Sequence, residues 1–229
     1  MVRSLAVHSL VDALVDSLRE RILTGEIQAG AALTEMEVAR DYDVARPTAR
    51  TAIERLVATG LLRRGAHKSA RVPVLGTAEI RDMYFARGCL EAETLRRLAA
   101  TRAIPEAARD AVGELAAMTD SGSLAALVEP DIRFHQELVD ALASPRLSRL
   151  HVAVMGEMRL CMAQVQAHRL LRPEEIVAEH ELILERVAAG DADGAAAAGV
   201  AHLDRACTEL TQHLDQTSGA EGSGTTRSG

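Results

Sequence analysis

The second part of the chain, from residue 77 onward, consists of long helix-forming stretches that are separated only by short breaks. Apolar residues recur along these stretches at the spacing of one helical face, which predicts amphipathic helices. We expect helices at residues 77–101, 105–119, 124–143, 145–167, 173–189 and 191–214. The breaks are marked by Pro105, Ser121-Gly122-Ser123, Pro145, Pro173 and Gly190. Because short connections make successive long helices antiparallel, this pattern predicts an all-helical bundle.

The composition agrees with a helical fold and an aliphatic core. Aromatic residues make up only 2% of the chain and tryptophan is absent, so alanine, leucine and valine must fill the interior. The cysteines Cys89, Cys161 and Cys207 lie far apart in predicted helices, which argues against a disulfide framework. Because no apolar run reaches the ~18 residues of a membrane helix, we expect a cytoplasmic protein without a membrane partner.

The first 75 residues show a different pattern, in which short helices precede two extended pieces. The helices are expected at residues 8–24, 34–43 and 47–59. Thr34 and Glu37 form a capping-box pattern, and Pro47 suits a first helical turn because its missing N–H costs nothing there. The extended pieces lie at 61–64 and 70–74, around a tip at 65–69. This order predicts a winged helix-turn-helix.

The expected fold class is therefore mainly α, with an N-terminal winged helix-turn-helix and a C-terminal antiparallel all-helical bundle. A chain of 229 residues is long enough for two domains that each bury a core. The expected boundaries are 1–72 for the winged domain, 73–76 for a linker, 77–214 for the bundle and 215–229 for a disordered tail.

The charge is distributed unevenly between these two parts. Residues 40–71 contain eight basic and three acidic side chains, a net charge of +5, whereas residues 76–229 contain 15 basic and 24 acidic ones, a net charge of −9. The overall charge of −7 conceals this difference. The winged part is therefore suited to approach phosphate groups, and the bundle is not.

Several segments resemble two domains of one family of bacterial regulators. Residues 33–39, 44–53 and 60–62 resemble the DNA-binding domain of GntR-type regulators. Residues 87–91, 131–135, 179–180, 190–191 and 202–203 resemble the FadR-like ligand domain, the FCD class. The combination is specific because two independent patterns occur in the family's order. The chain departs from the family at residues 45–50, where Ala-Arg-Pro-Thr-Ala-Arg replaces the usual Ser-Arg-Thr-Pro-Val-Arg, so the operator sequence does not carry over.

The third predicted helix carries the residues best placed to contact DNA. Arg46 and Arg50 lie one turn apart near its start, and arginine can bind O6 and N7 of guanine in the major groove. Thr48 and the helix N-terminus suit a phosphate. The wing tip carries His67 and the chain's only lysine, Lys68, which suit a phosphate or the minor groove. The alternative, a solvated basic face, is disfavoured by the coincidence with the helix-turn-helix pattern.

An aspartate and three histidines on three predicted helices point toward the core. Asp131 and His135 lie four residues apart, so one helix presents both on the same face. His180 and His202 lie on or beside the apolar stripes of two later helices. A single histidine in such a place is more often a hydrogen-bonded core residue. The resemblance implies instead that the four residues bind one divalent metal, and the ligand set suits Zn²⁺ as well as Ni²⁺, Mn²⁺ or Fe²⁺.

Arg87 precedes Glu91 by one turn in the first helix of the bundle, a spacing typical of an intrahelical ion pair. The resemblance implies a second role, in which Arg87 binds the carboxylate of an effector while the metal takes another of its oxygens. Tyr84, one turn earlier, is placed to line the same pocket.

The sequence thus predicts a transcriptional repressor, not an enzyme, that a small carboxylate effector releases from palindromic operator DNA. We expect a homodimer, because one short recognition helix reads too few bases alone. One alternative is a metal-dependent hydrolase with a structural N-terminal domain, although the chain has no His-Glu-x-x-His helix or nucleophile elbow. The other is an architectural DNA-binding protein in which the metal only stiffens the bundle.

Overall fold

The computed structural model describes residues 10–64, 69–118, 127–165 and 172–222, with side chains up to residue 217. It divides into two compact units, Met1–Val74 and Leu75–Gly229, which are described separately. Both units are built mainly from helices, and only the first contains a described sheet. The predicted fold class, mainly α with an N-terminal winged helix-turn-helix and a helical C-terminal part, is confirmed.

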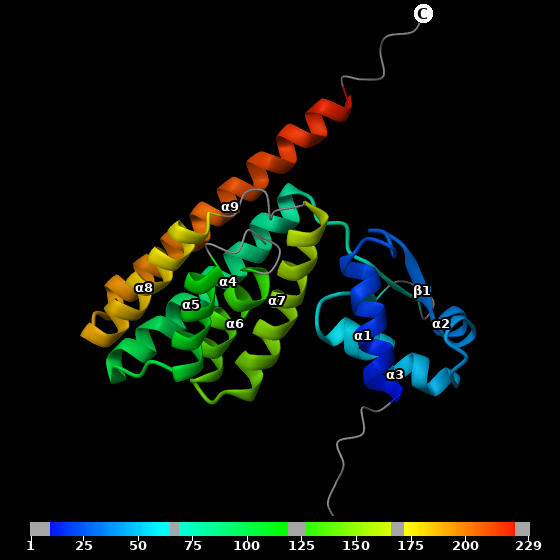
Figure 1. The fold of residues 1–229 in the computed structure, drawn as a ribbon, viewed down its shortest axis with the longest axis horizontal. Coiled ribbons are helices and arrows are strands. Elements are labelled where there is room, and N and C mark those ends of the chain that lie inside the picture. Colours follow the sequence, from blue (N-terminus) through cyan, green and yellow to red (C-terminus); the bar gives the residue numbers. More distant parts are fainter. Residues whose placement is uncertain (1–9, 65–68, 119–126, 166–171, 223–229) are drawn as a thin grey trace, which may run out of the picture. The chain divides into compact units, whose positions relative to one another are not determined.

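The first unit contains the helices α1 (Leu10–Leu23), α2 (Glu35–Asp41) and α3 (Arg46–Ala58), labelled in Figure 1. The predicted capping box is present at α2, where the Thr34 hydroxyl accepts from the Glu37 N–H at 3.2 Å and the Glu37 carboxylate accepts from the Thr34 N–H. α3 begins with proline in its first turn, as predicted. The three helices bury aliphatic side chains against one another, among them Leu18, Ile53 and Leu56.

A small antiparallel sheet completes the first unit. It consists of β1 (Ala32–Thr34), β2 (Arg63–Arg64) and β3 (Ser69–Arg71) in the order β1-β3-β2. The sequence pattern predicted β2 and β3 but started the first extended piece too early. The Leu61 and Leu62 N–H groups both bond to the Leu56 carbonyl, so these two buried residues belong to the turn that follows α3. β1 was not predicted, because a strand of three residues has no periodicity to detect.

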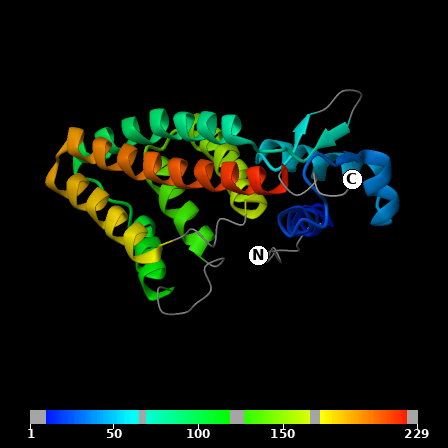
Figure 2. The ribbon, with the colours of Figure 1, turned by 90° about the horizontal axis from the view of Figure 1, so that it is seen from above.

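The second unit consists of six described helices, α4 (Thr77–Thr101), α5 (Glu106–Met118), α6 (Val128–Asp140), α7 (Pro145–Gln164), α8 (Pro173–Ala189) and α9 (Ala192–Gly222). The two long helices α4 and α9 lie side by side along most of their length, as Figure 1 and Figure 2 both show. α8 packs against α9, and α5 packs against α6. The first residues expected in the third helix of the bundle, 124–126, lie outside the described residues.

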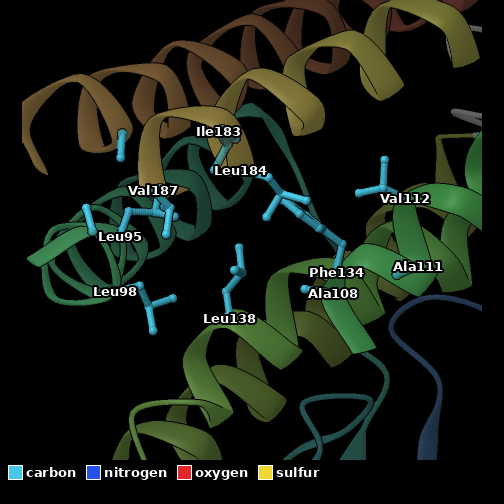
Figure 3. Packing of buried hydrophobic residues seen from close by; sticks show 12 residues of the cluster. Leu95, Leu98, Ala108, Ala111, Val112, Phe134, Leu138, Ile183, Leu184 and Val187 are labelled. Carbon is cyan, nitrogen blue, oxygen red and sulfur yellow. The ribbon is translucent and has the colours of Figure 1, made fainter. Parts of the chain in front are cut away.

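A continuous aliphatic core joins these helices (Figure 3). Its buried residues come from five helices and surround the chain's one fully buried phenylalanine, Phe134. α4 and α9 approach closely where Gly199 faces Leu95, because a Cβ at residue 199 would lie 2.5 Å from Leu95 Cδ1. The core is therefore mainly aliphatic, as the low aromatic content and the absence of tryptophan predicted.

The end of α9 corrects one expectation from the sequence. The tail was expected to begin at residue 215, but the helix continues to Gly222. The Asp215 carboxylate accepts a hydrogen bond of 2.8 Å from the Thr77 hydroxyl at the start of α4, and the Thr217 hydroxyl bonds back to the carbonyl of His213 at 3.1 Å. These contacts stabilise a segment whose glycine and serine content had suggested disorder.

None of the described helices combines the length and the apolar character that crossing a bilayer requires. The three cysteines are free, with Cys161 buried and Cys89 exposed.

Candidate metal centre and DNA-binding surface

Three helices of the second unit bring one carboxylate and three imidazoles together. α6 supplies Asp131 and His135, α8 supplies His180 and α9 supplies His202. One ligand atom from each residue lies within 4.8 Å of those of the other three. The three histidines are buried, and Asp131 is partly buried. The structure therefore assembles all four residues that the sequence proposed as metal ligands.

Two carboxylates orient two of these histidines. His135 Nδ1 lies 2.8 Å from Glu91 Oε2, and His202 Nδ1 lies 2.7 Å from Glu179 Oε2. A carboxylate accepts hydrogen bonds, so Nδ1 donates in each contact. A neutral ring in this orientation keeps the lone pair of Nε2 for a metal ion.

His180 is held by stacking and not by hydrogen bonds. Its ring stacks on Phe134 with 3.9 Å between the centroids. Among the residues that the structure describes, neither of its nitrogens has a hydrogen-bond partner, and Nε2 lies 3.5 Å from Asp131 Oδ1. Burial and the neighbouring His202 and His135 hold the pKa of His180 well below its usual value, so the ring is neutral. A neutral, unpartnered imidazole is the form in which histidine binds a metal.

Several buried nitrogens of the cluster lack a hydrogen-bond partner, as expected of residues that bind a metal ion. His135 Nε2 and both ring nitrogens of His180 are buried without a partner among the described residues. Leaving a buried polar atom unpaired costs about 1–3 kcal/mol. A divalent cation would bind these three nitrogens and the neighbouring carboxylate, which explains why the protein offers the nitrogens no partner of its own. The residues therefore fit a metal.

A small cavity of about 40 Å³ adjoins the cluster. Asp131, His202, Arg87 and Tyr84 all line it, so the two residues expected to bind the effector share a pocket with two of the expected metal ligands. Arg87 forms the intrahelical ion pair that its spacing predicts, since its Nε donates to Glu91 Oε1 at 2.8 Å. Its Nη2 is buried without a partner among the described residues.

Tyr84 supplies a neutral hydroxyl to this pocket. Burial raises the pKa of Tyr84 above its usual value, so the phenol stays protonated. The Arg87 guanidinium lies over the Tyr84 ring, 5.2 Å from its centroid. The ring thus positions the guanidinium beside the cavity through a cation–π contact.

Glu91 forms the centre of a buried network that the sequence indicated only in part. Besides Arg87 and His135, it contacts His151 Nε2 at 3.2 Å, and His151 Nδ1 lies 2.8 Å from Gln136 Oε1. Burial alone would raise the pKa of Glu91, but Arg87 and the histidine contacts hold it well below its usual range. The four-residue spacing to Arg87 predicted one of these contacts. The contacts with His135 and His151 could not be predicted, because these histidines lie far from Glu91 in the sequence.

Two further arginines line the pocket and were not predicted. Arg205 binds Glu179 through Nε and Nη2, each at 2.6 Å, and pairs with Glu209 at 3.0 Å. These contacts, together with the bond from His202, outweigh burial and lower the pKa of Glu179 to about 2. Arg172 stands immediately before α8 and pairs with Glu175. The sequence could have indicated Arg205, because it lies one helical turn after the proposed ligand His202.

The residues proposed for DNA contact lie at the start of α3. Arg46 and Arg50 are largely exposed, and each has an acidic neighbour: Glu35 at 3.8 Å from Arg46 and Glu54 at 2.9 Å from Arg50. Thr48 is half-buried in the same turn. β2 adds two exposed arginines, residues 63 and 64. His67 and Lys68 lie outside the described residues.

Comparisons with known proteins agree with both parts of the chain. Residues 10–72 match the family model "Bacterial regulatory proteins, gntR family", and residues 82–205 match the FCD domain. An HTH-type transcriptional regulator from the ttuE-ttuC' intergenic region of Agrobacterium vitis is 30% identical over 138 residues, which cover 58% of this chain and 81% of the relative. The regulator BphR of Paraburkholderia xenovorans is 33% identical over 91 residues, which cover 40% of this chain and 37% of BphR.

Solved structures show the same fold. A GntR transcriptional regulator from Rhodococcus sp. RHA1 aligns with a TM-score of 0.72 at 23% identity, covering 89% of this chain and 98% of that one. E. coli McbR/YncC aligns with a TM-score of 0.69 at 18% identity, over 89% and 98% of the two chains. The chain belongs to the GntR family of transcriptional regulators, with an FCD domain as its ligand-binding part.

Proposed function

We propose that this regulator is a repressor that binds palindromic operator DNA as a dimer and leaves it when a small carboxylate binds at a metal centre in the bundle. The observation that carries the proposal is the set of unpartnered buried atoms in the cluster and beside its cavity. His135 Nε2 and the His180 nitrogens belong to the cluster, whose Asp131 and His202 line the cavity, and Arg87 Nη2 belongs to a residue that also lines it. A cation would give the histidine nitrogens a partner, and the carboxylate of an effector would give Arg87 Nη2 one.

Asp131, His135, His180 and His202 would hold the metal, and Zn²⁺ is the first candidate for this ligand set, followed by Ni²⁺, Mn²⁺ and Fe²⁺. When bound, it supplies positive charge to an oxygen of the effector. The chain supplies the rest: Arg87 holds the carboxylate and Tyr84 offers a hydroxyl. A cavity of about 40 Å³ favours an effector of a few heavy atoms.

The alternative of a metal-dependent hydrolase receives less support from the same pocket. Hydrolysis at a metal requires a nearby general base. Among the described residues that line the cavity, the carboxylates are Asp131, which the proposal uses as a ligand, and Glu209, which pairs with Arg205. Every described acid in the pocket thus already has a partner or a role, which favours a sensor.

Metal content and operator release test the proposal together. Protein prepared without chelator is expected to contain about one divalent ion per chain, and His135→Ala, His180→Ala and His202→Ala are each expected to lose it. His213→Ala is the matched control, because His213 lies on α9 outside the cluster. Elemental analysis measures the content, and chelator is expected to lower the melting temperature of the wild type but not of the three variants.

A panel of organic acids then tests the effector. One of them is expected to weaken operator binding by roughly 5- to 150-fold, the range of a typical coupling of ~1–3 kcal/mol. Arg87→Met is expected to abolish this response while the metal stays bound. Variants without the metal that respond to the acid like the wild type would overturn the proposed sensor, and an acid that strengthens operator binding would overturn the proposed repressor.

A further inference from the structure

The cavity beside the cluster has, besides its polar residues, an apolar lining that the proposed function does not use. This lining comes from α7, α8 and α9, and it consists of Met158, Met162, Ile176, Ala206 and Leu210. Its four larger side chains are at most 8% exposed. Buried aliphatic and thioether groups offer no strong hydrogen bonds, so the part of an effector that contacts them gains affinity by being apolar itself.

The apolar lining begins next to a proposed metal ligand and continues along α9. His202, Ala206 and Leu210 follow one another at intervals of four residues, so they share one face of the helix. Each interval corresponds to ~6 Å along the helix axis. On α7, Met158 and Met162 likewise lie one turn apart. An effector whose carboxylate lies near His202 therefore meets apolar side chains within one to two helical turns.

The charged residues that flank this row already have partners. Arg205 donates to both carboxylate oxygens of Glu179 and to Glu209, and Arg172 pairs with the glutamate three residues later. Of the three arginines in the described lining, only Arg87 has a buried nitrogen without a partner. One such group matches one carboxylate. A second carboxylate on the effector would have to compete with an acid that is already paired.

The cavity is also poorly suited to an effector with several hydroxyl groups. The hydroxyl group of Tyr84 donates to Met158 Sδ at 3.5 Å, so its proton is used within the protein. Its oxygen can still accept one hydrogen bond, but the apolar lining adds no further partner. Each hydroxyl group buried without a partner is expected to weaken binding by about 5- to 150-fold.

We infer that the effector is a monocarboxylic acid with an apolar carbon skeleton, which binds with its carboxylate at Arg87 and its skeleton against the apolar lining. The inference rests on the proposed function and names the chemical class of its effector. The cavity of about 40 Å³ limits the skeleton to a few carbons, and the two methionines can adapt to its shape. Dicarboxylates and sugar acids are thereby disfavoured.

Three acids with four carbons test this class. Isothermal titration calorimetry on the full chain loaded with Zn²⁺ compares butyrate with its dicarboxylate counterpart, succinate, and with its hydroxylated counterpart, 2,3,4-trihydroxybutyrate. Butyrate is expected to bind at least about tenfold more tightly than either. Propionate, which is one methylene group shorter than butyrate, is expected to bind about fourfold more weakly. Operator release is expected to follow the same order.

A change in the volume of the apolar lining tests whether it contacts the skeleton. Met162→Ala enlarges the cavity and is expected to prefer hexanoate to butyrate, whereas the wild type prefers butyrate. Met155→Ala is the matched control, because Met155 is a buried methionine on the same helix that does not line the cavity. It is expected to lower the melting temperature and to keep the wild-type preference.

The outcomes separate this inference from the proposed function. Succinate or trihydroxybutyrate that binds as tightly as butyrate, and releases operator only when Arg87 is intact, would overturn the apolar class and leave the proposed function standing. A Met162→Ala variant with the wild-type preference would show that the apolar lining does not contact the effector. If no organic acid of any class binds to the metal-loaded chain, the proposed function fails and the inference fails with it.

Discussion

At the scale of single residues, the two candidate sites differ in how firmly their side chains are held. His135 and His202 are fixed by hydrogen bonds to carboxylates, and His180 is fixed by stacking on Phe134. Arg46 and Arg50 are exposed and held only by surface ion pairs. Such pairs contribute about 0–1 kcal/mol and exchange easily. The residues proposed for the sensor are thus pre-positioned, whereas the arginines proposed to contact DNA can leave Glu35 and Glu54 at little cost.

Arg46→Ala and Arg50→Ala are expected to relax the preference for one base pair each, at a cost of about 1–3 kcal/mol, because each variant loses a bidentate contact to guanine. Competition between the selected operator and single-base variants measures this preference. Lys68→Ala is expected to weaken binding to all sequences and to lower the salt dependence by about one charge.

Arg109→Ala serves as the matched control for this series, since Arg109 is an exposed arginine on α5 in the second unit. It should leave both the base preference and the salt dependence unchanged. If Arg46→Ala and Arg50→Ala keep the specificity ratio of the wild type, α3 does not read bases through these residues.

At the scale of elements, α4 and α9 connect the parts of the sensor. α4 carries Tyr84, Arg87 and Glu91, and α9 carries His202 and Arg205. Their close approach at Gly199 leaves no room for a side chain beside Leu95. The packing of these two helices therefore sets the distance between the residues that we propose to bind the effector and His202, which we propose as a metal ligand.

Gly199→Ala is expected to lower the free energy of unfolding by about 1–3 kcal/mol, because the new methyl group displaces the buried Leu95 side chain. Gly113→Ala, the same change in an exposed position of α5, meets nothing within 4 Å and is expected to raise it by about 0.4–1 kcal/mol. Urea unfolding followed by circular dichroism measures both changes. Equal effects of the two substitutions would show that α4 and α9 do not approach closely at this point.

At the scale of the whole molecule, the two parts of the chain carry net charges of opposite sign. The net charge of +5 at residues 40–71 favours phosphate, and the net charge of −9 at residues 76–229 keeps the bundle away from it. One recognition helix per chain contacts few base pairs, so high affinity requires two chains on two half-sites.

The spacing of the two half-sites tests this requirement. Inserting ~5 base pairs between them turns one half-site to the opposite face of the duplex and is expected to lower the affinity of the full chain at least tenfold. Scrambling one half-site is expected to have a similar effect. Titration by fluorescence anisotropy is expected to give two chains per intact operator. One chain per operator, with no effect of spacing, would contradict binding as a dimer.

The sequence by itself determined the features that depend on neighbouring residues. The capping box of Thr34 and Glu37, the proline in the first turn of α3 and the breaks at Pro145 and Gly190 act within a few residues, so they are visible in the order of the amino acids. The same holds for Asp131 and His135, which one helical turn brings together.

Only the tertiary structure decided which distant residues meet. β1 exists because Ala32 and Thr34 pair with β3, and Asp215 near the end of α9 accepts a hydrogen bond from Thr77, which lies 138 residues earlier in the chain. Glu91 and His151, 60 residues apart, meet only when α4 packs on α7. Such contacts depend on how helices pack, and side-chain packing leaves no local pattern in the sequence. The proposed metal ligands were therefore readable from the chain, whereas the carboxylates that orient them and the arginines around the pocket were not.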